Sequence, residues 1–199
     1  MRAIRICGFF ALLGLISCDI FHQDDPGCPP IAGLYFDVQN VSISPKRQND
    51  CCAIDVKVFE RMPFKNYRLQ IDLEATYYSM NTAPSHFSLI SSSYALSCAS
   101  NGQNGSKESI MEMDIITLYD IDYQHKKGQS VSDLFDIEEL GSRLNLNAYL
   151  SNEDHRLRSE QLNLYLNNQP ILNDTCAFKI KTILDNGESY TTITTPVIF

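Results

Sequence analysis

The chain has 199 residues, of which 24 are acidic and 16 are Lys or Arg, giving a formal net charge of −8 at pH 7. This length suits one domain with a sizeable buried core. The acidic balance argues against a nucleic-acid partner and against direct electrostatic adhesion to anionic lipid.

The N-terminus carries a targeting pattern. Arg2 and Arg5 precede an apolar run over residues 6–16, which is too short to span a bilayer core of about 30 Å. Such a pattern is typical of a signal peptide, and we expect residues 1–17 to be removed. Because that segment holds both arginines and no acidic residue, the mature chain would be more acidic than the whole.

The end of this segment, LISC at residues 15–18, resembles the lipobox of bacterial lipoproteins. The sequence therefore predicts that Cys18 is lipidated and anchors the protein to a membrane, because several acyl chains on one residue hold durably. The alternative is an ordinary secretory signal cut nearby, with Cys18 incidental. Residues 18–30 are polar and end in Pro-Gly-Cys-Pro-Pro, which predicts a tether before a single domain over 31–199.

Alternation of apolar and polar residues with a period of two dominates the first half of the domain. It predicts strands within 34–43, 54–58, 69–77, 86–90, 94–98 and 111–122. The cleanest is 69–77, where one face would be buried and the other wet. In the first strand the alternation slips at Gln39-Asn40, which indicates a bulge or a turn between two short strands.

One helix is expected in the middle of the domain. Ser130-Val131-Ser132-Asp133 fits a capping box. The apolar residues that follow, as far as Leu140, have roughly helical spacing, and Gly141 is placed to end the helix. Residues 144–150 fit either a second short helix or a strand.

The C-terminal part is a β meander. Strands are expected at 162–166, 178–184 and 190–199, and Asp185-Asn186-Gly187 predicts a hairpin turn, because Asn-Gly accepts positive φ. Pro196 has no N–H and so belongs at a sheet edge or a strand end. Many short strands with little helix predict an all-β fold, an antiparallel β-sandwich of immunoglobulin-like type with one or two short helices.

The cysteines beyond Cys18 lie in a compartment that permits disulfides. They are Cys28, Cys51, Cys52, Cys98 and Cys176. Because their number is odd, at least one thiol stays free if no partner chain is involved. We expect one bridge from Cys28 to the adjacent pair Cys51-Cys52 and another joining Cys98 to Cys176.

Several segments carry a resemblance when they are taken in order. After the lipobox come SSYALSC at 92–98, MDIITLYDIDY at 113–123, SVSDLFDI at 130–137 and FKIKTILDNGESYTTIT at 178–194. Together they resemble a group of Bacteroidales cell-envelope lipoproteins of similar length, a domain of unknown function. The resemblance covers nearly the whole mature chain and implies a β-rich domain at the cell envelope. It implies no catalytic or binding residues.

Acidic residues follow the lipobox cysteine at Asp19, Asp24 and Asp25. In enterobacteria an aspartate directly after this cysteine resembles an inner-membrane retention signal. In Bacteroidetes an acidic cluster there resembles the export signal of surface lipoproteins. With the resemblance above, we expect an outer-membrane lipoprotein exposed at the cell surface. A periplasm-facing lipoprotein, or acids that merely solvate the tether, are the alternatives.

Motifs of several enzyme and cofactor classes are absent from the sequence, among them GxSxG, HExxH, a Walker A loop and GxGxxG, and we expect no catalytic residue and no cofactor. One constellation suggests a metal site: Asp120 and Asp122 would share a strand face, with His125 in the next loop. The alternative is that these polar residues lie at the solvated end of a strand and bind no metal. Because the chain has no Trp, sugar stacking would fall to tyrosines such as Tyr78, which we expect to be exposed on the sheet.

Three functions fit these observations. The one we favour is a non-enzymatic binding or accessory module at the bacterial surface, held by its lipid and binding a glycan or a protein. The second is a structural or assembly component of a surface complex, joined through an exposed strand edge by β-augmentation. The third is a metal-dependent enzyme built on Asp120, Asp122 and His125.

Overall fold

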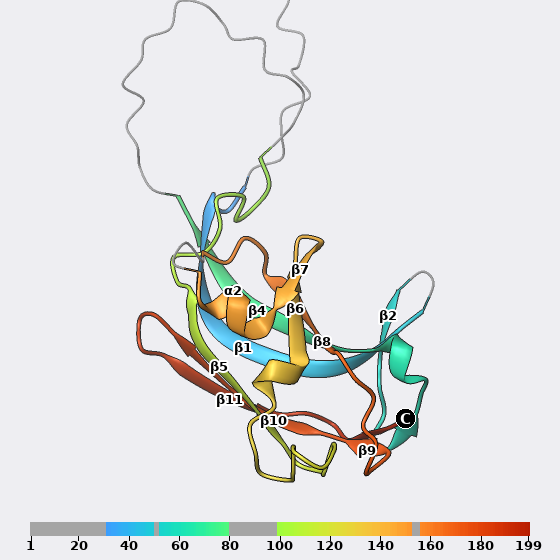
Figure 1. The fold of residues 1–199 in the computed structure, drawn as a ribbon. Coiled ribbons are helices and arrows are strands. Elements are labelled where there is room, and N and C mark those ends of the chain that lie inside the picture. Colours follow the sequence, from blue (N-terminus) through green and yellow to red (C-terminus); the bar gives the residue numbers. More distant parts are fainter. Residues whose placement is uncertain (1–30, 50–51, 80–98, 153–155) are drawn as a thin grey trace, which may run out of the picture. The chain divides into compact units, whose positions relative to one another are not determined.

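The computed structural model describes residues 31–49, 52–79, 99–152 and 156–199 (Figure 1). About half of the described residues lie in strands, and short helical segments lie between some of the strands. The expected signal peptide, the lipidated Cys18 with its tether, and the strands expected at 86–90 and 94–98 lie outside it. Those expectations therefore stay predictions.

Six antiparallel strands form the larger sheet, in the order β2-β1-β4-β8-β6-β7. They are β1 (Tyr35–Gln48), β2 (Ala53–Asp55), β4 (Tyr67–Tyr78), β6 (Phe135–Glu139), β7 (Ser142–Asn145) and β8 (Gln161–Leu166). The strands expected over 69–77 and 162–166 are confirmed as β4 and β8. Alternation explains them, because it buries residues such as Ile71 and Leu164 completely in the core.

β1 is one long strand with a bulge in its first half. Its pairing with β4 shifts register between Val38 and Asn40, so the expected bulge is confirmed and the alternative of two separate strands is wrong. Beside the bulge the Val38 N–H donates to the carboxyl group of Glu108, 3.2 Å away, which is almost fully buried. Burial raises the pKa of Glu108. A buried side chain thus satisfies a backbone donor at the irregular point of the strand.

The second sheet has three antiparallel strands, in the order β11-β10-β5. These are β5 (Ile110–Thr117), β10 (Phe178–Leu184) and β11 (Ser189–Ile193). The hairpin turn between β10 and β11 is confirmed, with Gly187 at a φ of 88°. The expected continuation of β5 to Asp122 is wrong. Beyond Thr117 the chain leaves the sheet, and the Leu118 N–H donates to the carbonyl of Ala177.

A third, small sheet contains β3 (Glu60–Arg61), β12 (Val197–Ile198) and β9 (Thr175–Cys176), in that order. β12 runs parallel to β3 and antiparallel to β9. The strand expected over 190–199 is therefore divided into β11 and β12. Pro196 lies just before β12, as expected of a residue without an N–H, and its carbonyl accepts the N–H of Phe59. The strand expected over 54–58 is wrong beyond Asp55, since Val58 is exposed outside any sheet.

The two larger sheets pack face to face around one core. Phe135 of β6 and Phe178 of β10 meet edge to face, with ring centroids 5.1 Å apart and planes at 84°, and both are fully buried. In Figure 1 the long strands β1 and β4 curve over the sheet of β5, β10 and β11. The expected antiparallel β-sandwich is confirmed. Its six-stranded sheet opposite a three-stranded one differs from the four-on-three arrangement of an immunoglobulin constant domain.

The helix expected over 130–141 is wrong. Only a 3₁₀ turn, η2 (Ser132–Leu134), precedes β6. Phe135 and Ile137 are fully buried, and the strand pairs with β8, so tertiary packing overrides the helical spacing. Gly141 does not end a helix but lies in the turn between β6 and β7, with a φ of 79°.

Residues 144–150, for which the sequence left helix and strand open, contain both. β7 runs to Asn145, and α2 (Leu146–Leu150) begins directly after it. The Asn145 side chain accepts the N–H of Asn147 at 3.1 Å and so caps the helix. α2 packs against β5, β6 and β7. This packing places Tyr149 next to the end of β6.

Candidate functional site

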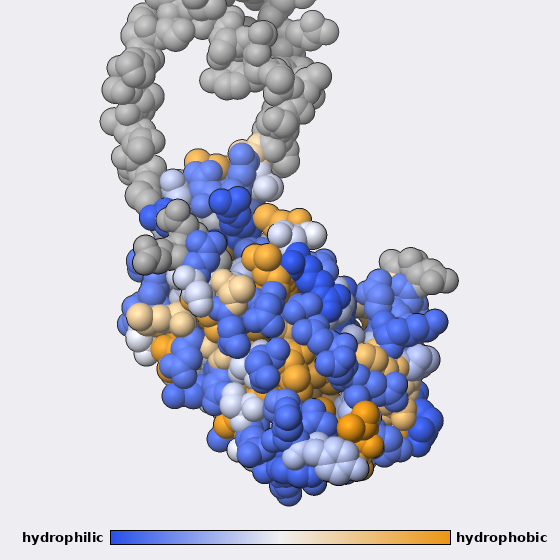
Figure 2. All heavy atoms as spheres, in the orientation of Figure 1, coloured by the Kyte–Doolittle hydropathy of each residue, from blue (hydrophilic) through white to orange (hydrophobic). Residues whose placement is uncertain are grey.

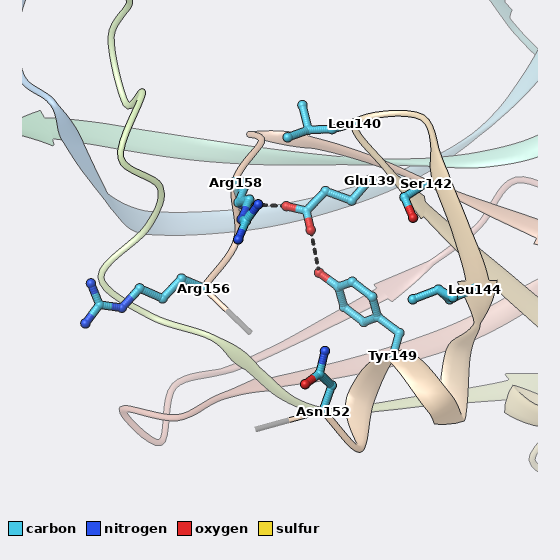
Figure 3. Close-up of a pocket in the computed structure, with 8 residues that line it drawn as sticks. All are labelled: Glu139, Leu140, Ser142, Leu144, Tyr149, Asn152, Arg156 and Arg158. Carbon is cyan, nitrogen blue, oxygen red and sulfur yellow. Dashed lines mark hydrogen bonds between the residues drawn. The ribbon is translucent and has the colours of Figure 1, made fainter. Parts of the chain in front are cut away.

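A hollow of about 430 Å³ opens beside α2 and the β6–β7 hairpin (Figure 3). We call it the first hollow, and its volume is in the range of small-molecule sites. Its walls combine charged, hydroxyl, carboxamide and aliphatic side chains: Glu139, Leu140, Ser142, Leu144, Tyr149, Asn152, Arg156 and Arg158. None of these residues is among those expected from the sequence to form a site.

Glu139, the last residue of β6, joins three parts of the chain. Its carboxylate accepts the hydroxyl of Tyr149 and the N–H of Ser159, each at 3.2 Å, and also the N–H of Arg158. Figure 3 shows Glu139 and Tyr149 pointing toward one another from β6 and α2. Because hydrogen bonds to an ionised carboxylate are the stronger kind, Glu139 holds residues 158–159 firmly against the hairpin.

Tyr149 lines the first hollow although its side chain is only 5% exposed. Burial raises the pKa of Tyr149, and the charge and the hydrogen bond of Glu139 raise it further. The side chain is therefore a neutral phenol at physiological pH. Arg156 and Arg158 add two guanidinium groups to the lining. The first hollow thus combines a neutral phenol with two cationic side chains.

The rim of the first hollow carries an apolar lip. Leu140 lies in the hairpin turn, with a positive φ of 50°, and is 70% exposed. Leu144 of β7 is also exposed and lines the same hollow. A leucine in this backbone region costs on the order of 1 kcal/mol, so the turn presents an apolar side chain to solvent at an energetic cost.

A second hollow, of about 400 Å³, has one wall residue in common with the first, namely Arg158. Its lining is mostly polar: Phe36, Ser100, Asn101, Gly102, Gln103, Arg158, Ser159, Glu160 and Gln161. The carboxamide oxygen of Asn101 accepts the N–H of Ala32 at 2.8 Å, which leaves its NH₂ group as a donor. The two hollows therefore adjoin along the segment that leads into β8.

The two arginines of the first hollow are its main positive charges. Both are exposed, and neither belongs to an ion pair in the part of the chain that the structure describes. By contrast, Arg143 pairs with the carboxylate of Asp136 at 3.0 Å. In Figure 3, Arg156 extends away from Tyr149, toward the outer side of the site. Two guanidinium groups that form no ion pair with any described residue thus border a hollow in a protein of net negative charge.

The residues expected as a metal constellation are only partly brought together. His125 Nδ1 lies 2.9 Å from a carboxylate oxygen of Asp122, and its Nε2 lies 3.5 Å from one of Asp133. Asp120 instead accepts the N–H of Lys127 at 2.8 Å, because β5 ends before it and the two aspartates share no strand face. Among the described residues, no group of three or more His, Cys, Asp or Glu side chains is arranged to hold a metal ion.

The pair of Asp122 and His125 makes stability depend on pH. Its hydrogen bond raises the pKa of His125 and lowers that of Asp122. The contribution of His125 is therefore complete below its unfolded pKa of about 6.5 and is lost as pH rises through its raised folded value. That of Asp122 is present above its unfolded pKa of about 3.9 and is lost as pH falls through its lowered folded value. His125→Gln should lower the free energy of unfolding by about 0.5–1 kcal/mol near pH ~5.5 and by less near pH ~8.5.

Urea denaturation of the wild type, His125→Gln and Asp122→Asn at both pH values measures this effect. Asp122→Asn should remove the same pH-dependent difference, because it takes away the partner charge. An equal loss at both pH values would show that the pair contributes through packing and not through charge.

Tyr78, expected to be an exposed contact residue, is half-buried, so the expected exposure is wrong. Its ring stacks on that of Tyr35, with centroids 5.7 Å apart and planes at 24°. This stacking accounts for its burial, since the two residues are direct partners in the β1–β4 pairing. Tyr78 lines neither the first nor the second hollow.

Neither expected disulfide bridge is observed in the part of the chain that the structure describes. Cys176 of β9 is a buried free thiol, and burial raises its pKa. The expected bridge between Cys98 and Cys176 is therefore not formed. Cys28, Cys51 and Cys98 lie outside the described residues, and Cys52 is exposed just before β2. The bridge from Cys28 to the adjacent pair stays a prediction.

The fold and the two hollows together define an all-β sandwich domain with a polar, partly cationic surface site. No protein-family model matches the chain, and no curated protein matches it in sequence. The expected relation to Bacteroidales envelope lipoproteins therefore stays a prediction. Within the described ranges, no helix has the length and apolar character needed to cross a membrane.

Proposed function

We propose that this protein is a lipid-anchored, non-enzymatic binding module of the bacterial cell envelope, with the first hollow as its ligand site. The proposal is supported by the hydrogen bonding and the protonation of two polar side chains in this hollow. The carboxylate of Glu139 is engaged by three donors, and Tyr149 stays a neutral phenol. Groups committed in this way can orient a ligand but are poorly placed to transfer its protons.

The anchoring part of the proposal rests on the sequence. LISC at 15–18 supplies the lipobox, and Cys18 would carry the acyl chains. The acidic domain has no electrostatic attraction to anionic lipid of its own. A covalent lipid is therefore the means by which it would stay at the membrane, and we place it on the outer membrane, facing the cell surface.

Metabolic labelling with palmitate tests the anchor. The full chain, produced in a bacterium with lipoprotein-processing enzymes, should take up label and enter the membrane fraction. Cys18→Ala should do neither, whereas Cys28→Ala, which also removes one early cysteine, should behave like the wild type. Label in the Cys18→Ala protein would contradict the proposal.

Ligand binding is tested with a glycan array and a pull-down from envelope extracts. We expect a ligand that binds the wild type and is lost in Ser142→Tyr, a variant that fills the first hollow from an exposed position of β7. Thermal unfolding should be unchanged in this variant, which separates blocking from misfolding. A ligand that both proteins bind equally would place the site elsewhere.

The second candidate is a structural component of a surface complex. It is favoured by β11, which lies at the edge of its sheet (Figure 1) and exposes the apolar Ile193. Such an edge can accept a strand from a partner. A stoichiometric protein in the pull-down, with no glycan on the array, would favour this function over the first.

A further inference from the structure

Arg158 stands at the junction of two hollows. The first hollow, of about 430 Å³, and the second, of about 400 Å³, both include it in their walls. Each is large enough for one small ligand unit. A ligand that occupied both would be an oligomer, with one of its units passing directly over Arg158.

The backbone on both sides of Arg158 is fixed from several directions. Leu157 exchanges two hydrogen bonds with Ser106, at 2.7 and 3.1 Å. Glu139 accepts the N–H of Arg158, and the carbonyl of Glu160 accepts the N–H of Leu73 at 2.8 Å. The wall between the hollows is therefore built before any ligand arrives, which lowers the entropic cost of binding.

The guanidinium group of Arg158 is available to bind a ligand. It is exposed and has no carboxylate partner in the described part of the chain, since Glu139 meets only its backbone N–H. The carboxyl group of Glu160 instead interacts with the hydroxyl group of Tyr77 and raises the pKa of that tyrosine. A guanidinium group matches a carboxylate with two parallel hydrogen bonds, so the charge at the junction favours an acidic group on the ligand.

The remaining lining favours a ligand rich in hydroxyl groups. The first hollow offers Ser142 and Asn152, and the second offers Asn101, Gln103 and Gln161. Hydroxyl and carboxamide groups both donate and accept hydrogen bonds, as a sugar hydroxyl also does. Figure 2 shows a face on which hydrophilic residues predominate and hydrophobic residues lie in patches between them.

We propose that the two hollows form one extended site for an acidic oligosaccharide, with Arg158 binding a carboxylate at their junction. This proposal rests on the proposed binding function and names the ligand class. The hydroxyl groups of the units on either side lie against the hydroxyl and carboxamide side chains of the two hollows. Leu140 and Leu144 cover the apolar face of the unit in the first hollow.

Isothermal titration calorimetry on the full chain in detergent tests the proposal. The probes are tetragalacturonate, monomeric galacturonate, neutral maltotetraose and tetra-aspartate. Tetragalacturonate should bind at least about tenfold more tightly than the monomer, because both hollows act together. Tetragalacturonate should also bind more tightly than maltotetraose, which lacks the carboxylates, and more tightly than tetra-aspartate, which lacks the hydroxyl groups.

Arg158→Gln should weaken tetragalacturonate binding about tenfold or more, because a hydrogen-bonded charge pair is lost. It should leave maltotetraose unaffected. Lys181→Gln, which removes one exposed positive charge from β10, is the matched control and should bind like the wild type. Unchanged binding in Arg158→Gln would overturn the proposal, as would equal binding of monomer and tetramer, or of tetra-aspartate and tetragalacturonate.

Failure of this proposal can be told from failure of the proposed function. Maltotetraose that binds the wild type as well as tetragalacturonate does, and is lost in Ser142→Tyr, would leave a binding module but overturn the acidic ligand. If no saccharide binds and the pull-down yields a stoichiometric protein, the proposed binding of a glycan is itself wrong. The second candidate function, a structural component of a surface complex, is then favoured.

Discussion

Phe135→Ala should lower the free energy of unfolding by about 3–5 kcal/mol. Phe135 is fully buried and meets Phe178 edge to face across the two sheets. Removing its ring takes away apolar burial, leaves a cavity and ends the aromatic contact that joins β6 to β10. Urea denaturation at neutral pH measures the effect, with the midpoint and the slope reported separately.

Phe59→Ala is the matched control, because it removes the same ring from a position that is 54% exposed. We expect a change within about 0.5 kcal/mol there. A comparable loss in both variants would mean that the ring acts through the unfolded state and not through the contact between the sheets.

Gly105→Ala should be the second large effect, at about 2–4 kcal/mol, because two costs add. Gly105 has a φ of 90°, which an alanine adopts only with strain, and an added Cβ would lie 2.8 Å from the carbonyl oxygen of Leu157. Neither backbone segment can move away easily, because the carbonyl of Gly105 accepts the N–H of Phe36 and the carbonyl of Leu157 accepts the N–H of Ser106. Denaturation monitored by circular dichroism measures the loss.

Gly128→Ala separates the two costs. Gly128 has nearly the same φ, 86°, but an added Cβ would meet nothing within 4 Å. It should cost about 1 kcal/mol, from backbone strain alone. The difference between the variants then reports the close approach to Leu157, and equal losses would show that this approach does not constrain the fold.

The strands that could be predicted are those whose environment is the same along their whole length. β4, β8 and β10 each have one face in the core and one outside, so their alternation appears directly in the sequence. The turn at Gly187 could be predicted because its backbone demands a residue that tolerates positive φ. In all these places the information is local.

β6 could not be predicted, because its local signals favour a helix. A capping box precedes it, and the apolar residues at 134, 135, 137 and 140 also fit helical spacing. The strand conformation of this segment is stabilised by β8, which pairs with β6, and by the burial of Phe135 and Ile137. That partner lies well beyond the segment in the chain, where no local pattern can show it.

The candidate site was missed for a related reason. Glu139, Tyr149 and Arg158 come from a strand, a helix and a loop, and they meet only through tertiary structure. Moreover, two of the three donors to Glu139 are backbone N–H groups, which carry no signature in the sequence. Asp122 and His125, which are close in sequence, could be predicted to lie together, whereas Asp120 depended on where β5 ends.

The place of β4 in the larger sheet has a consequence for the order of folding. Its first neighbour, β1, precedes it closely in the chain, but its second neighbour is β8, with Leu69 opposite Leu164. Pairing over such a sequence separation raises the contact order and slows folding. Until β8 has been made and docked, β4 keeps one open edge of hydrogen-bonding groups and an uncovered apolar face. During that interval two nascent copies of the chain can pair with each other through β4.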